Sequence, residues 1–106
     1  MTGTVQNLMA ELKHGVEVKY RERLRGLYLY GSYARGQQES DSDVDVLIVL
    51  DQVDSYGAEI DRTSDLVSSL SLRYGISLSR VFVAEEAWRS GRGAFLSALR
   101  GEAIAA

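Results

Sequence analysis

Residues 30–50 read YGSYARGQQESDSDVDVLIVL, and the last seven of them decide the fold. The run VDVLIVL (44–50) is almost entirely apolar, which is typical of a central strand that is covered on both faces. At its entrance, Asp43 and Asp45 are two residues apart, so their side chains leave the same face of the strand. The sequence therefore predicts a buried strand with two carboxylates at its mouth.

A Gly-Ser pair ends an earlier short strand. LYLY (27–30) is β-prone and is followed directly by Gly31 and Ser32. A glycine after a strand lets the backbone approach a ligand closely, and the N–H groups of the turn with the Ser32 hydroxyl can receive phosphate oxygens. Arg35 adds a cation within reach of this turn, where it either binds phosphate or pairs with a nearby acid. We interpret the turn as a candidate phosphate site.

The two aspartates need a compensating cation. Carboxylates this close to an apolar core repel each other and take up protons unless a positive charge offsets them. Carboxylate oxygens suit Mg²⁺ or Mn²⁺, and Mg²⁺ usually takes one or two carboxylates together with substrate phosphates. Asp43 and Asp45 are thus candidate metal ligands of a metal–nucleotide site. A calcium loop of the EF-hand type is excluded because Val46 stands where its obligatory glycine belongs.

Apolar residues at helical spacing flank these strands and predict amphipathic helices. In chain order we expect a helix over about 5–24 with Gly26 as its stop, strands over 27–30 and 44–50, a helix over 56–74 that Asp54 or Ser55 caps and Gly75 closes, a strand over 76–84, a short helix from 85, and a helical segment over 94–104. This order predicts an α/β (α+β) fold, a small mixed β-sheet flanked by helices, in a single domain over 1–106.

Composition narrows the class of protein. The 106 residues have room for one core, and the net charge of −3 is too mild for generic nucleic-acid binding. The absence of cysteine excludes a disulfide framework and a Cys-based metal site. No apolar stretch could cross a bilayer and no signal pattern opens the chain, so we expect a cytoplasmic protein without a membrane partner. A domain this small buries little surface, which favours a homo- or hetero-oligomer.

The spacing of the two motifs resembles a known signature. Gly31-Ser32, ten intervening residues and Asp43-Val44-Asp45 resemble the motif of the DNA polymerase beta-like nucleotidyltransferase superfamily. GSYARG followed by SDVDVLIVL is similar to its minimal nucleotidyltransferase branch, small domains often encoded beside a HEPN-domain partner in prokaryotic toxin–antitoxin pairs. The resemblance implies a nucleotidyltransferase-like fold in which Gly31 and Ser32 hold the phosphates of ATP or another NTP, while Asp43 and Asp45 hold Mg²⁺.

Two functions stay open. The resemblance implies transfer of a nucleoside monophosphate, AMP from ATP, to a hydroxyl of the HEPN toxin, which neutralises that toxin. Active members carry a third carboxylate on a later strand, where this chain offers Ser77 or Ser79, and a serine is a poor metal ligand and base. Glu85 and Glu86 follow that strand but do not match the motif. The alternative is a catalytically impaired, nucleotide-binding antitoxin that masks its toxin by complex formation.

Overall fold

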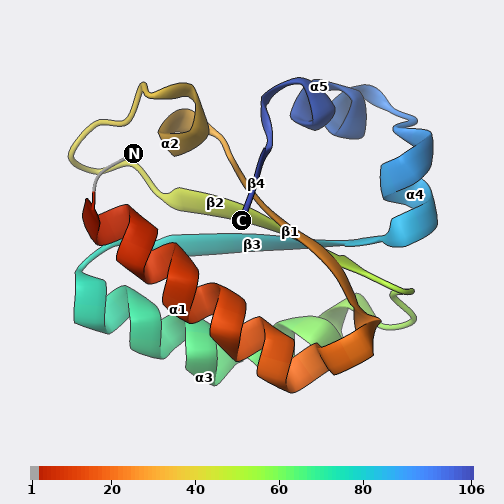
Figure 1. The fold of residues 1–106 in the computed structure, drawn as a ribbon, viewed down its shortest axis with the longest axis horizontal. Helices are drawn as coiled ribbons and strands as arrows, with labels where there is room; N and C mark the ends of the chain where they lie inside the picture. Colours follow the sequence, from red (N-terminus) through yellow and green to blue (C-terminus); the bar gives the residue numbers. More distant parts are fainter. Residues whose placement is uncertain (1–2) are drawn as a thin grey trace.

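The predicted central strand lies inside a four-stranded mixed sheet in the computed structural model, which describes residues 3–106 (Figure 1). The elements are α1 (Gly3–Tyr20), the 3₁₀ turn η1 (Arg21–Arg23), β1 (Leu24–Tyr30), α2 (Ser32–Arg35), β2 (Val44–Leu50), α3 (Tyr56–Tyr74), β3 (Leu78–Ala84), α4 (Glu85–Ser90), α5 (Ala94–Glu102) and β4 (Ile104–Ala105). The strand order is β3-β2-β1-β4, with β2 parallel to β3 and β1 antiparallel to both β2 and β4. The mixed sheet flanked by helices is therefore confirmed.

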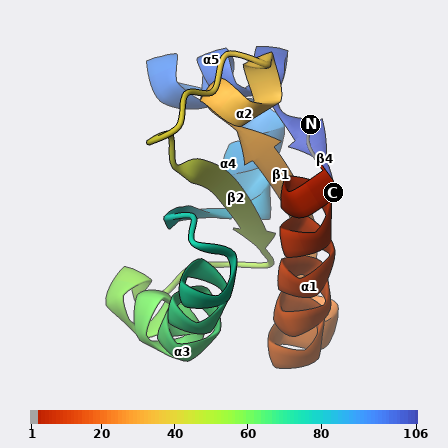
Figure 2. The ribbon, with the colours of Figure 1, turned by 90° about the vertical axis from the view of Figure 1, so that its left-hand side faces the viewer.

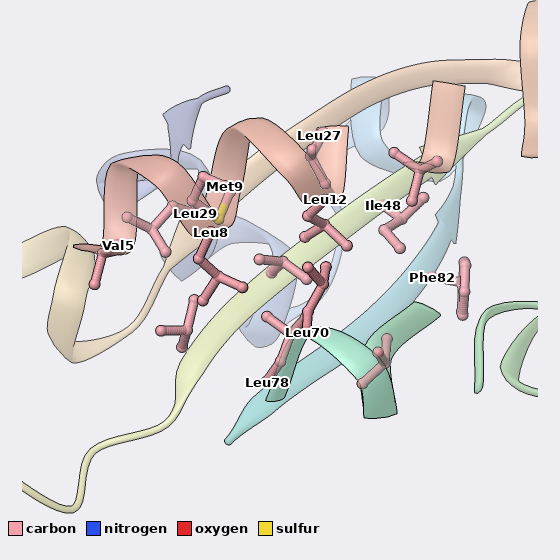
Figure 3. Packing of buried hydrophobic residues seen from close by; sticks show 14 of the residues in the cluster. Val5, Leu8, Met9, Leu12, Leu27, Leu29, Ile48, Leu70, Leu78 and Phe82 are labelled. Carbon is pink, nitrogen blue, oxygen red and sulfur yellow. The ribbon is translucent and has the colours of Figure 1, made fainter. Parts of the chain in front are cut away.

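Both faces of β2 are covered, which explains its almost unbroken apolar run. Helices α1 and α3 lie on one face of the sheet, and α4 and α5 lie on the other (Figures 1 and 2). Val46 and Ile48 pack with the first pair of helices in the main core, part of which Figure 3 shows. Leu47 and Val49 pack on the opposite face with Leu99 of α5. Because side chains alternate along a strand, Asp45 belongs to the same face as Leu47 and therefore to the side of α5.

The predicted boundary between the first helix and the first strand is wrong. The α-helix ends at Tyr20 rather than near 24, and Arg21 follows with a φ of +51°, in the left-handed region where a helix cannot continue. Gly26 is not a helix stop but lies within β1, at a shift in the pairing register with β2. Pairing with the long buried β2 draws residues 24–26 into the sheet, and helical periodicity cannot reveal that.

The chain's last segment also differs from the expectation. The predicted helix over 94–104 ends at Glu102, and Ile104–Ala105 form β4 against the free edge of β1. Backbone pairing at that edge outweighs the local helical pattern. The predicted third strand begins at Leu78 rather than at residue 76, because the Ile76 N–H still donates to the Ser71 carbonyl at the end of α3. Ser55 is confirmed as the cap of α3, since its hydroxyl accepts from the Ala58 N–H.

One acid is buried away from the candidate site. Glu59 of α3 is only 4% exposed and accepts hydrogen bonds from the Tyr20 hydroxyl at 2.8 Å and from Arg23 and Arg62, each at 3.1 Å. Burial alone would raise the pKa of Glu59, but these three donors outweigh burial and lower the pKa below its ordinary value. Glu59 therefore ties α3 to the end of α1 through its ionised form.

We expect Glu59→Gln to lower the free energy of unfolding at pH 7 by about 2 kcal/mol, the scale for losing charge-assisted hydrogen bonds. A carboxyl whose folded pKa is lowered stabilises the fold above its unfolded pKa and loses that contribution as the pH falls through the folded pKa. The difference in free energy of unfolding between wild type and variant, measured by urea unfolding, should therefore become smaller as the pH falls below 4. A gap that stays constant between pH 7 and pH 3 would contradict this role.

Candidate active site

The Gly-Ser turn has the backbone shape that a close approach requires. Gly31 caps the single-turn helix α2 with φ 77° and ψ −157°, a conformation that is essentially restricted to glycine. Backbone hydrogen bonds close the turn, among them those from the Arg35 N–H to the Gly31 carbonyl at 3.1 Å and from the Gln37 N–H to the Ser32 carbonyl at 2.9 Å. The predicted turn is thus present, contains the single helical turn α2 and begins directly where β1 ends.

The structure brings this turn against one of the two predicted aspartates. Tyr30, the last residue of β1, is the pairing partner of Asp45 on β2. Gly31 follows, and a Cβ atom built on it would lie 2.2 Å from the Asp45 Oδ2 atom. Only a residue without a side chain can occupy this position. The two motifs, separated in sequence, therefore meet at Gly31 and Asp45.

Asp43 lies just before β2 and is exposed, while Asp45 is half-buried. Asp43 borders a cavity of about 260 Å³ whose lining residues are Tyr33, Ser40, Asp41, Ser42, Asp43, Gly75, Ile76 and Ser77. The cavity lies between the loop after α2 and the connection from α3 to β3. Ligand oxygens can therefore reach Asp43 from solvent, whereas Asp45 is approached past the Gly31 turn.

The electrostatics of Asp45 favour a bound cation. Burial, and next the negative charge of Asp43, raise the pKa of Asp45 above its ordinary value, and Glu102 contributes in the same direction. Arg35 opposes this shift without reversing it. The folded protein thus holds a carboxylate whose charge is not offset by its surroundings. A divalent cation at this position would supply the missing positive charge.

The donor set fits Mg²⁺ or Mn²⁺ only together with a ligand. Within residues 3–106 no group of three His, Cys, Asp or Glu side chains is placed to hold a metal ion. Two carboxylates beside a candidate phosphate-binding turn match the usual sharing of Mg²⁺ between protein and substrate phosphates. Asp43 and Asp45 therefore suit an ion that arrives with its nucleotide, and they do not form a closed metal cage.

The sheet register distinguishes the two serines. Ser79 of β3 is the pairing partner of Asp45 in the parallel β2–β3 ladder, so their side chains share a face. Ser77 precedes β3 and meets β2 through its backbone, since its carbonyl accepts from the Val44 N–H at 2.9 Å. Ser79 is thus the residue that lies beside Asp45.

Glu102 also contacts the candidate site, and its sequence position did not predict this. One carboxylate oxygen, Oε2, accepts from the Gly31 N–H at 2.8 Å and from Nη1 of Arg35 at 2.9 Å. The sequence allowed Arg35 either to bind phosphate or to pair with an acid, and in the structure it forms an ion pair with Glu102. One sequence feature could have pointed to Glu102. It is an acid in the last turn of a predicted helix, where the helix dipole favours cations, so its carboxylate needs a partner elsewhere.

No helix within residues 3–106 combines the length and the apolar character that crossing a bilayer requires.

The chain is similar in sequence to a known family and to named relatives. The family model described as a nucleotidyltransferase domain matches residues 10–88, which include the Gly-Ser turn, both aspartates and β3. A "putative protein adenylyltransferase" of Methanocaldococcus jannaschii is 35% identical over 81 residues, which cover 76% of this chain and 75% of the relative. The protein adenylyltransferase MntA of Thermococcus cleftensis is 35% identical over 60 residues, which cover 57% and 61% of the two chains.

Among solved structures, a toxin–antitoxin complex with AMP-PNP contains a similar chain, with a TM-score of 0.60 and 21% identity over 90% of this chain and 70% of that chain. A mutant MntA–HpeT toxin–antitoxin complex is similar to the same extent, with a TM-score of 0.60 and 18% identity. At this level of identity the likeness supports the fold.

Proposed function

The chain belongs to the nucleotidyltransferase domain family, and we propose that it transfers a nucleoside monophosphate, AMP from ATP, to a hydroxyl of a partner protein. The observation that carries the proposal is the contact between Gly31 and Asp45, which joins a phosphate-binding turn to a pair of carboxylates. Relatives named protein adenylyltransferases support the choice of AMP and of a protein acceptor. We further propose that the partner is a HEPN-domain toxin and that this chain is its antitoxin.

Each residue of the site has a distinct role in the proposed reaction. Ser32 and Arg35 would bind the β- and γ-phosphates of the nucleotide. Gly31, whose N–H is taken by Glu102, lets the turn approach the phosphates closely, and Asp43 and Asp45 would hold Mg²⁺. The bound ion supplies charge neutralisation of the phosphates. The turn and the carboxylates fix the triphosphate so that the α-phosphate faces the acceptor hydroxyl. The hydroxyl oxygen forms the new bond to the α-phosphorus and loses its proton to water, the bond from the α-phosphorus to the oxygen of the β-phosphate breaks, and pyrophosphate leaves.

A second function is favoured by one specific observation. Ser79 lies beside Asp45, where a third carboxylate would complete the metal site and take the proton of the acceptor hydroxyl. A serine hydroxyl does neither at neutral pH. The alternative is therefore an antitoxin that binds the nucleotide without transferring it and neutralises its toxin by forming a complex.

Incubation with ATP radiolabelled at the α-phosphate and a purified HEPN-domain toxin, the proposed partner, separates the two functions. Transfer predicts label on the toxin that depends on Mg²⁺ and disappears when the metal is chelated. A stable complex without label, together with protection of cells by an Asp43→Asn variant, would leave only the masking function.

A further inference from the structure

We propose that Glu102 is a positioning residue of the candidate site, because its carboxylate holds the Gly31 turn and aims Arg35 at the phosphates. The inference rests on the proposed function and adds to it a residue from the far end of the chain. Glu102 is the last residue of α5 and lies outside residues 10–88, which the family model matches.

Gly31 is held on three sides. Its buried N–H needs an acceptor, and Glu102 Oε2 supplies one at 2.8 Å. Its carbonyl accepts from the Arg35 N–H at 3.1 Å, and its Cα atom lies against the Asp45 carboxylate. Glycine is free to leave this conformation for others, so the turn keeps it only where its surroundings fix it. Without Glu102, one of the three constraints on the turn is lost.

Arg35 is oriented by the same oxygen. Its Nη1 donates to Glu102 at 2.9 Å and its Nε donates to the Gln37 side chain at 3.1 Å. Within the described part of the chain no oxygen accepts from Nη2, and the side chain is 46% exposed. The Ser32 hydroxyl is likewise without a bonded partner among residues 3–106. Glu102 thus occupies one edge of the guanidinium and leaves another edge, with Ser32, available to a phosphate.

The location of Glu102 has a local cost. A carboxylate at the C-terminal end of a helix opposes the macrodipole, which favours cations there. Glu102 also adds negative charge beside Asp45, at a site proposed to bind a polyphosphate. Its bonds to Gly31 and Arg35 offset both penalties. The opposite role, in which Glu102 blocks the phosphate position and has to leave it, is an outcome that the experiment distinguishes.

The test compares wild type with Glu102→Gln and Glu102→Ala in the full chain. NMR titrations measure the affinities for Mg²⁺–ATP and for AMP, and hydrogen exchange measures protection of the Gly31 amide. Either variant should weaken ATP binding about tenfold, the scale of one charge-assisted hydrogen bond, and leave AMP binding unchanged because AMP lacks the outer phosphates. The Gly31 amide should stay protected in the Gln variant, whose amide oxygen still accepts, and should exchange faster in the Ala variant.

A matched control is Glu17→Gln, which removes one negative charge from an exposed position of α1 on the opposite side of the sheet. It should leave all three readouts unchanged. Three results would each overturn the positioning role. They are an unaltered ATP affinity in both Glu102 variants, tighter ATP binding, and an equal loss of affinity for ATP and for AMP. A different result would contradict the proposed function: the wild type binds no ATP, while the Gly31 amide exchanges in the Glu102 variants as expected. The positioning role, which rests on that function, would then be contradicted as well.

Discussion

Replacing Asp43 and Asp45 together with asparagine is expected to abolish Mg²⁺-dependent ATP binding, with a loss of affinity greater than about 100-fold. Loss of a group that merely supports a metal ligand already costs about 10- to 100-fold, and this change removes both ligands. The variant should fold at least as stably as wild type. Asp45 is a carboxylate that burial and Asp43 disfavour in its charged form, and asparagine removes that penalty. Calorimetry with and without Mg²⁺ and a thermal melt measure the two effects.

Asp61→Asn with Asp65→Asn is the matched control, since it removes two negative charges from exposed positions of α3. It should bind ATP as wild type does. Undiminished Mg²⁺-dependent binding in the Asp43 and Asp45 variant would contradict the site assignment. A variant that loses binding because it unfolds would be recognised from its melt, and the single change Asp43→Asn, at an exposed position, would then carry the test.

Ser79→Asp should raise the rate of nucleotide transfer to the toxin by at least about tenfold, the lower end of what a group supporting a metal contributes. The reason is geometric. Neighbouring strands are about 4.8 Å apart, so an aspartate in register with Asp45 would bring a third carboxylate to the same ion. Transfer of label from ATP measures the rate. In the absence of metal the variant should melt at a lower temperature than wild type, because three carboxylates then repel one another, and Mg²⁺ should reverse the loss.

Ser77→Asp is the control for this change, because Ser77 precedes β3 and is not paired with Asp45. It adds the same charge in the cavity beside Asp43 but out of register with Asp45, so it should not reproduce the gain in transfer rate. Equal transfer rates for wild type and the Ser79 variant would contradict the assignment of the third carboxylate position to Ser79. A gain confined to the Ser77 variant would assign that position to Ser77.

The parts of the fold and site that could be predicted from sequence depend on local chemistry. An apolar run such as 44–50 has no stable place except between two covering layers, so the central strand was identified correctly. Gly31 and Asp45 were predicted as halves of one site because a glycine after a strand and an acid inside an apolar strand each need a specific reason. The structure brings them into contact.

The parts that were missed depend on contacts between distant residues. Leu24 belongs to β1 because it pairs with Leu50, and no local pattern shows that pairing. Ile104 joins the sheet only because β1 has a free edge beside it. Glu102 is 71 residues from Gly31, and only the path of α5 across the sheet brings the two together. A helix that ends in an acid was the one sequence feature that pointed to this contact.

A crystal structure with Mn²⁺ and a non-hydrolysable ATP analogue tests the central claim most directly, because anomalous scattering locates the metal independently of the nucleotide. We expect one Mn²⁺ ion bound by the Asp43 and Asp45 carboxylates and by the phosphates, with the β- and γ-phosphates at the Gly31-Ser32 turn. A nucleotide seated away from that turn, or an Mn²⁺ ion bound by neither aspartate, would contradict it.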